Sequence, residues 1–177
     1  MSNLEYSDNE GKELITYVKE GIDKMNLKEP LSILEGVKYK QARGVIISVM
    51  TDKGMILEMI ETNSRSLNNN LLEAMKKLTV RTNHEEIING KIRMIILSGI
   101  SKISIKEINP QKDVLKCKYY MREGMILPEE ANPLTGMPTS DKIKYLERLC
   151  SKTGIPKDSW EKEKFELWKY EGQTFEG

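Results

Sequence analysis

The sequence predicts an α+β protein, in which a small, strongly bent antiparallel β-barrel carries an N-terminal helix, a helical insertion and a C-terminal pair of helices. Residues 91–107 form a long run of Ile, Leu and Met that ends in strict alternation, which is typical of a strand buried on one face. An Asp-Lys-Gly turn at residues 52–54 separates two further apolar runs and predicts a hairpin. Apolar residues at helical spacing precede and follow these strands.

The N-terminal helix is expected over residues 7–27. Ser7 and Glu10 have the spacing of a capping box, which satisfies backbone N–H groups at a helix start, and Pro30 ends the helix. Its apolar side chains fall on one face, at Leu14, Ile15, Val18, Ile22 and Met25. We expect this face to pack on the β unit, as in an ordinary core-facing helix, or on a partner.

The barrel strands are expected between residue 31 and residue 61. Three candidates follow one another, at residues 31–40, 43–50 and 55–61. Their connections are too short for parallel crossovers, so the strands are predicted to form an antiparallel meander.

Three glycines are predicted to have structural roles in these strands. Gly44 opens the second candidate strand, and Gly54 closes the hairpin turn with a positive φ. Gly99 interrupts the apolar run, and a glycine inside a strand pattern usually marks a bend. We therefore expect Gly99 at a bent strand position next to a neighbouring backbone.

A helical insertion is expected within residues 63–89. Leu67, Leu71, Met75 and Leu78 recur at helical spacing, with residues 68–70, all asparagine, on the other side. Residues 79–89 are predicted to be a polar loop. The single histidine, His84, lies in this loop and is interpreted as solvated, because a catalytic base needs an orienting partner that the sequence does not identify.

The rest of the chain is predicted to contain one more hairpin, a linker and two helices. The hairpin is expected over residues 114–127 around a turn at residues 122–124, and the proline-containing stretch 128–138 is the clearest internal boundary. One helix follows near residue 139 and stops at Gly154. A last helix carries both tryptophans. The expected domains are a helix at 1–29, the barrel at 30–127, the linker at 128–138 and a helical extension at 139–177.

Composition limits the classes of function. Charged residues make up 31% of the chain, yet 28 basic and 27 acidic residues give a net charge of only +1, which argues against strong nonspecific attraction to nucleic acid. Cys117, Cys150 and His84 are too few for a zinc site built from Cys and His alone, so neither a metal nor a cofactor is expected. No signal peptide or membrane span is visible, which predicts an intracellular protein in the cytoplasm or nucleus.

The order of strands and glycines resembles the Sm/Lsm family of small, strongly bent barrels. Residues 52–57, Asp-Lys-Gly-Met-Ile-Leu, resemble the family's first motif of Asp, two variable residues, Met, Asn and Leu. Residues 97–99, Leu-Ser-Gly, stand where the second motif has an apolar residue, Arg and Gly. The resemblance covers residues 32–108.

The resemblance implies a divergent Sm-like protein that has lost uridine recognition. Ile56 and Ser98 replace the Asn and Arg that hold the uridine, and neither side chain can replace their hydrogen bonds and stacking. The implied function is a non-catalytic scaffold or adaptor subunit of a ribonucleoprotein assembly or RNA-metabolism complex. Such a subunit acts by protein–protein contacts with other subunits, Sm-like chains among them, and meets RNA directly or through the complex.

Two other functions remain open beside the scaffold. No recognisable catalytic set is present, so the chain is not expected to be an enzyme, although a small enzyme of unrecognised type stays a third alternative. The second alternative is a nucleic-acid-binding barrel that uses lysines interleaved with aromatic residues. Its candidate contacts are Lys38, Tyr39, Lys40, Arg43, Lys116, Lys118, Tyr119 and Tyr120. The candidate partner-binding residues of the scaffold are Trp160, Phe165, Leu167 and Trp168, because aromatic residues dominate interface energetics.

Overall fold

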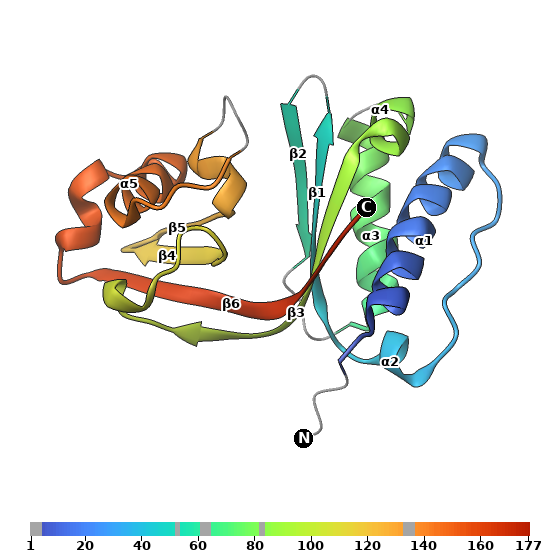
Figure 1. The fold of residues 1–177 in the computed structure, drawn as a ribbon, viewed down its shortest axis with the longest axis horizontal. Helices are drawn as coiled ribbons and strands as arrows, with labels where there is room; N and C mark the ends of the chain where they lie inside the picture. The colour runs from blue at the N-terminus through green and yellow to red at the C-terminus, as the bar shows by residue number, and fades with distance from the viewer. Residues whose placement is uncertain (1–4, 52–53, 61–64, 82–83, 133–136) are drawn as a thin grey trace. The chain divides into compact units, whose positions relative to one another are not determined.

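The computed structural model describes residues 5–51, 54–60, 65–81, 84–132 and 137–177, with only the backbone of residues 57–60 and 84. The chain forms two compact units: unit 1 is Met1–Ser98 with Gly172–Gly177, and unit 2 is Gly99–Glu171. The strands form a six-stranded antiparallel sheet in the order β2-β1-β3-β6-β4-β5 (Figure 1). Strands β3 (Lys91–Lys102) and β6 (Phe165–Glu176) each contribute residues to both units.

The α+β class predicted from the sequence is confirmed, and so is the N-terminal helix. Helix α1 (Asp8–Leu27) begins with the predicted capping box: the Glu10 backbone N–H donates to the Ser7 hydroxyl, and the Ser7 N–H donates to the Glu10 carboxylate at 2.7 Å. Lys28 ends the helix in the left-handed conformation, with φ of 60°. Leu14, Ile15, Val18 and Ile22 are buried on the inner face, as the spacing predicted.

Strands β1 (Gly44–Thr51) and β2 (Gly54–Ile60) form the predicted hairpin. Thr51 pairs with Gly54, which has a φ of +118°, a conformation that favours glycine. On its other edge β1 pairs with β3, where Val45 lies opposite Ile96. The two edges of β1 are therefore both occupied by neighbouring strands.

The first candidate strand, residues 31–40, is not a strand. Residues 31–35 have no regular structure, and the short helix α2 (Val37–Lys40) follows Gly36, whose φ is +129°. Ile33 and Val37 are exposed, whereas Leu31 and Leu34 pack against the core of unit 1. The apolar composition of this segment predicted a strand wrongly. The segment packs on the core through a few side chains, and it cannot pair with β1, because β2 and β3 occupy both edges of that strand.

Helix α3 (Leu67–Arg81) confirms the predicted insertion, since Leu67, Leu71, Met75 and Leu78 are fully buried. The asparagines behave differently from the prediction, because Asn68 and Asn70 are buried as well. The polar loop predicted over residues 79–89 is also wrong: α3 runs to Arg81, and helix α4 (His84–Asn89) follows. Ile87 of α4 is fully buried and fixes this helix to the core.

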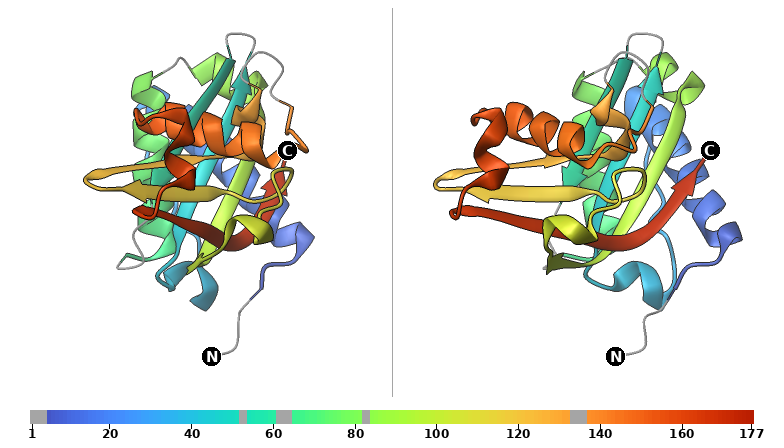
Figure 2. Two further views of the ribbon diagram at one scale, coloured as in Figure 1. Left: turned by 90° about the vertical axis from the view of Figure 1, so that its left-hand side faces the viewer. Right: turned by 60° about the vertical axis from the view of Figure 1, so that its left-hand side comes forward.

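The core of unit 1 lies between its helices and one face of its strands. Helices α1, α3 and α4 lie on the same side of β1 and β3 (Figures 1 and 2). Alternate strand residues face them, which is the pattern of a sheet covered by helices on that side. These inward residues are Val45, Ile47, Val49, Ile92, Met94 and Ile96.

Unit 2 packs helix α5 (Lys142–Thr153) on a hairpin of β4 (Leu115–Tyr119) and β5 (Arg122–Ile126), as Figure 2 shows. The predicted hairpin and helix are thus confirmed, but the turn expected at residues 122–124 lies at residues 120–121, with Tyr120 in the left-handed conformation at φ of 55°. Asp141 caps α5 by accepting from the N–H groups of Ile143 and Lys144. The Tyr145 side chain is fully buried at the centre of the core.

The last predicted helix is wrong, because residues 165–176 form strand β6. Phe165 pairs with Tyr119 and Trp168 with Lys116 on β4. Aromatic residues favour strands, and β4 offers a free edge that satisfies the backbone of this segment. Trp160 lies before the strand, in a short 3₁₀ helix (Lys157–Glu161).

The boundary between the compact units differs from the one expected at residues 128–138. The units divide inside β3 and β6, whereas Pro128 is buried in a 3₁₀ helix (Pro128–Ala131) and residues 133–136 lie outside the described residues. The alternating half of the apolar run is also shorter than expected, since β3 ends at Lys102 and a 3₁₀ helix (Ile105–Glu107) follows.

The close backbone approach predicted at Gly99 occurs at another glycine. A Cβ added at Gly99 would meet only a carboxylate oxygen of Glu171, at 3.5 Å, so no neighbouring backbone requires a glycine there. A Cβ at Gly172 would lie 2.4 Å from the Ile96 carbonyl oxygen, which no L side chain tolerates. Gly172 is therefore the residue that lets β6 approach β3 in unit 1.

Candidate ligand-binding pocket

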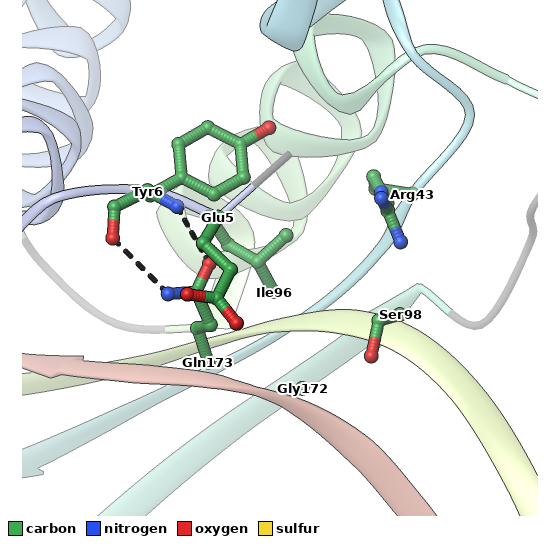
Figure 3. A pocket seen from close by; sticks show the side chains of 7 residues that line it. All are labelled: Glu5, Tyr6, Arg43, Ile96, Ser98, Gly172 and Gln173. Atoms are coloured by element: carbon green, nitrogen blue, oxygen red, sulfur yellow. Dashed lines mark hydrogen bonds between the residues drawn. The ribbon is translucent and has the colours of Figure 1, made fainter. Parts of the chain in front are cut away.

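A cavity of about 130 Å³ opens in unit 1 where the segment before α1 meets β3 and β6. Figure 3 shows the side chains around it. The lining is mostly polar and comes from four separate parts of the chain: Glu5, Tyr6, Arg43, Ile96, Ser98, Gly172 and Gln173.

Tyr6 forms one wall of the cavity and is held in place by two reciprocal hydrogen bonds with Gln173. The Tyr6 backbone N–H donates to Gln173 Oε1 at 2.7 Å, and Gln173 Nε2 donates to the Tyr6 carbonyl at 3.0 Å (Figure 3). The Tyr6 ring packs edge-on against Phe175, and its phenol donates to the Lys38 carbonyl at 3.1 Å. These contacts fix the segment before α1 to β6 and leave the wall little freedom to move.

The Tyr6 phenol is neutral at ordinary pH. Burial raises its pKa to about 12, although the nearby positive charge of Arg43 acts in the opposite direction. A phenol with such a pKa donates a hydrogen bond and does not accept a proton from a substrate near neutral pH.

Arg43 is the positively charged group of the pocket. Its backbone is held by Asn70, whose fully buried side chain donates to the Arg43 carbonyl at 2.7 Å. Its guanidinium forms no ion pair or hydrogen bond with any residue that the structure describes. The charge is therefore half-buried, beside a cavity, and available.

The other members of the predicted cluster around Arg43 do not share this position. Lys38 pairs with Glu10 at 2.9 Å and donates to the Glu5 carbonyl at 2.8 Å, so its charge is already neutralised. The Tyr39 ring lies 6.1 Å from the Tyr6 ring and packs against the core. Lys40 is exposed on α2 and does not line the cavity.

The floor of the pocket consists of Ile96, Ser98 and Gly172. Ile96 belongs to the core, and Gly172, which has no side chain, lines the cavity with its backbone. The Ser98 side chain is exposed, and Figure 3 shows it on the Arg43 side of the cavity. Ser98 therefore lines a candidate pocket, although the sequence suggested only the loss of a uridine site at this position.

The second predicted cluster lies in unit 2, on β4 and the turn after it. Lys116 and Lys118 both pair with Glu123, at 3.3 and 3.7 Å, and the rings of Tyr119 and Tyr120 pack edge-on at 4.6 Å. Tyr120 is exposed beside a hollow with acidic and basic residues on its rim. The nucleic-acid role of these four residues stays a prediction.

The candidate partner-binding residues are largely part of the core of unit 2. Leu167 is buried, and Trp160 and Phe165 pack against the core with partly exposed rings. The Lys102 ammonium lies 5.8 Å from the centre of the Trp168 ring. Their role in binding a partner also stays a prediction.

The two cysteines do not form a reactive site. Both are buried in unit 2, and burial raises the pKa of the Cys117 thiol and raises that of Cys150 to about 11, which keeps both protonated. The described residues contain no group of three or more His, Cys, Asp or Glu side chains arranged for a metal ion. Within the same residues, no helix combines the length and apolar character needed to cross a bilayer.

Sequence reasoning missed most of the pocket. Tyr6 and Gln173 are 167 positions apart, and no local pattern connects them. Asn70 was expected on the polar side of its helix, but it is buried. A buried amide needs hydrogen-bond partners, and Asn70 finds one in the backbone of another segment, at Arg43.

The fold and the pocket define an α+β protein of two compact units, with a small polar cavity in unit 1. The model of the AMMECR1 family matches residues 80–175, more than half of the chain, and the chain belongs to this family. A protein of Methanocella arvoryzae (strain DSM 22066 / NBRC 105507 / MRE50) is 34% identical over 68 residues. That match spans 37% of this chain and only 31% of the relative's length.

A solved structure has the same fold along nearly the whole chain. The crystal structure of the uncharacterized protein PH0010 from Pyrococcus horikoshii matches with a TM-score of 0.75 and 19% identity. The match covers 94% of this chain and 90% of that one, and at this identity it shows the fold alone.

These findings overturn the Sm/Lsm resemblance. The family is AMMECR1, and the structural match extends far beyond residues 32–108. The expected first strand of the barrel is absent, and residues 97–99 lie inside one continuous strand, β3. The Sm-like, ribonucleoprotein description rested on that resemblance and falls with it, whereas the binding of other protein subunits stays a prediction.

Proposed function

We propose that this chain is a non-catalytic binding protein whose unit-1 pocket holds the anionic group of a small ligand. The observation that carries the proposal is the Arg43 guanidinium, which lines the cavity and has no partner among the described residues. Fully buried charges are normally paired, and the half-buried guanidinium of Arg43, which lines a cavity, is placed to be paired by a charge that a ligand supplies.

The chemistry of the pocket favours a carboxylate. A guanidinium presents its N–H donors in a planar fork, which matches the two oxygens of a carboxylate. The Ser98 hydroxyl lies on the same side and can donate a further hydrogen bond (Figure 3). The cavity, at about 130 Å³, is close to the size of one that accommodates benzene, about 150 Å³. It suits a ligand group of few atoms.

Binding is favoured over catalysis by the state of the groups that line the pocket. Tyr6 is held in its neutral form, and the Ser98 hydroxyl has no hydrogen bond to a base among the described residues. A serine nucleophile needs such a base to become reactive.

The test is isothermal titration of the full chain with acetate, propionate and methylammonium. We expect the two carboxylates to bind with a Kd on the order of 1 mM, because such small ligands make few contacts, and methylammonium alone not to bind. Arg43→Gln should abolish carboxylate binding, whereas Arg122→Gln, at an exposed arginine of unit 2, should leave it unchanged. Equal binding by wild type and Arg43→Gln would refute the proposal.

A further inference from the structure

We infer that the ligand of the unit-1 pocket is a small zwitterion of the amino-acid class, with its carboxylate at Arg43 and its ammonium group at Glu5. This inference rests on the proposed function and adds a positive charge, the ammonium group, to the ligand. Glu5 and Arg43 both line the cavity, and neither side-chain charge is paired with a described residue.

The two charges lie on different sides of the space. Figure 3 shows the Glu5 carboxylate beside Gln173, and Arg43 beside Ser98, with Ile96 between the two groups. An anion without a positive group would meet attraction from Arg43 and repulsion from Glu5. A zwitterion satisfies both, because like charges disfavour and opposite charges favour a bound group at short range.

Glu5 is held at the pocket by its backbone. Its carbonyl accepts from Lys38 Nζ at 2.8 Å, and the next residue, Tyr6, is tied to Gln173. Lys38 does not neutralise the Glu5 carboxylate, because the side-chain partner of its ammonium is Glu10, at 2.9 Å. The Glu5 backbone is therefore fixed at the pocket, and its exposed carboxylate is left available for a positive group.

Size restricts the class further. Glycine, alanine and β-alanine have about as many non-hydrogen atoms as benzene, which a cavity of about 150 Å³ accommodates. The cavity holds about 130 Å³, so amino acids with short side chains fit inside it, whereas the ring of an aromatic one would gain no contacts within it.

The test is titration calorimetry of the full chain with glycine, alanine, β-alanine, γ-aminobutyrate and phenylalanine, with acetate as the reference. We expect at least one of the short zwitterions to bind at least tenfold more tightly than acetate, and phenylalanine not to bind. Glu5→Gln should remove the tenfold preference while leaving acetate binding equal or stronger. Arg43→Gln should abolish binding of both kinds of ligand.

The control variant is Glu20→Gln, at an exposed position of α1 that does not line the cavity, which should change nothing. If acetate binds as tightly as every zwitterion and Glu5→Gln alters neither, the inference is wrong and the proposed function stands. If neither acetate nor any zwitterion binds, the proposed function itself is wrong. Circular dichroism of each variant, compared with wild type, separates lost binding from lost folding.

Discussion

The two units treat their charged residues differently. In unit 2 the two lysines singled out by the sequence, Lys116 and Lys118, both face Glu123, and Lys102 also has an acidic partner, Glu166 at 2.7 Å. In unit 1 the pocket leaves Arg43 and Glu5 without partners among the described residues. The difference teaches that a basic residue near aromatic residues can already be paired within its own unit, as Lys116 and Lys118 are, or can line a cavity without a described partner, as Arg43 does.

The units also differ in how buried polar groups are used. In unit 1 the amides of Asn68 and Asn70 hold the carbonyls of Leu34 and Arg43, at 2.9 and 2.7 Å, so helix α3 positions irregular backbone. In unit 2 the Tyr145 phenol donates to the Asp113 carbonyl at 2.7 Å and lies 3.2 Å from the Ile126 carbonyl. The first arrangement supports the pocket, and the second supports only the core.

The largest effect is expected at Gly172. A valine there would place its Cβ 2.4 Å from the Ile96 carbonyl oxygen, so Gly172→Val should lower the free energy of unfolding by roughly 3 kcal/mol. The matched variant Gly99→Val, on β3, where a Cβ would meet only the Glu171 carboxylate at an ordinary contact distance of 3.5 Å, should change it by less than about 0.5 kcal/mol. Urea denaturation measures both. Equal losses at the two glycines would show that the close approach in unit 1 is not what requires Gly172.

Asn70→Ala should cost about 2 kcal/mol, because it leaves the Arg43 carbonyl without its donor. The same variant should weaken acetate binding, since the backbone that carries Arg43 loses its support. Thermal unfolding and titration, run on the same preparation, test the two effects. A variant that is destabilised but binds acetate with unchanged affinity would show that α3 does not support the pocket.

Tyr145→Phe is the corresponding change in unit 2 and should cost about 1 kcal/mol, since the ring still fills the core and only the phenol hydroxyl is lost. Acetate affinity should remain that of wild type, because Tyr145 supports no part of the pocket. A fall in affinity as large as that of Asn70→Ala would remove the functional distinction between the units.

The smallest effect concerns two matched capping boxes. In unit 1 a hydrogen bond from the Ser7 backbone N–H, and to a smaller extent one from the Lys38 side chain, lowers the pKa of Glu10. In unit 2 a hydrogen bond from the Ser104 backbone N–H lowers the pKa of Glu107, and no lysine that the structure describes donates a hydrogen bond to this carboxylate. Because each folded pKa lies below the unfolded value of about 4.3, the stabilisation is present above that pH and is lost as the pH falls through the folded pKa.

Glu10→Gln should therefore lower the unfolding midpoint at pH 7 more than Glu107→Gln does, and both effects should shrink in acid, as the pH falls through the folded pKa of each carboxyl. Thermal melts at neutral and at acidic pH measure the difference. An effect of Glu10→Gln that is equally large at acidic pH would show that the carboxylate charge is not its cause.

The sequence by itself determined the elements that follow local physical rules. The capping box at Ser7, the buried stripes of α1 and α3, the hairpin closed at Gly54 and the stop of α5 at Gly154 were all readable. Each depends on side chains only a few positions apart, and period and turn chemistry describe such contacts well.

Only the tertiary structure decided the rest. Residues 165–176 form a strand because β4 offers an edge for their backbone, and residues 31–36 do not because both edges of β1 are taken. The pocket depends on Tyr6 meeting Gln173 and on β6 passing Ile96 at Gly172. Contacts between residues so far apart follow from how strands pair and pack, which no local spacing in the sequence encodes.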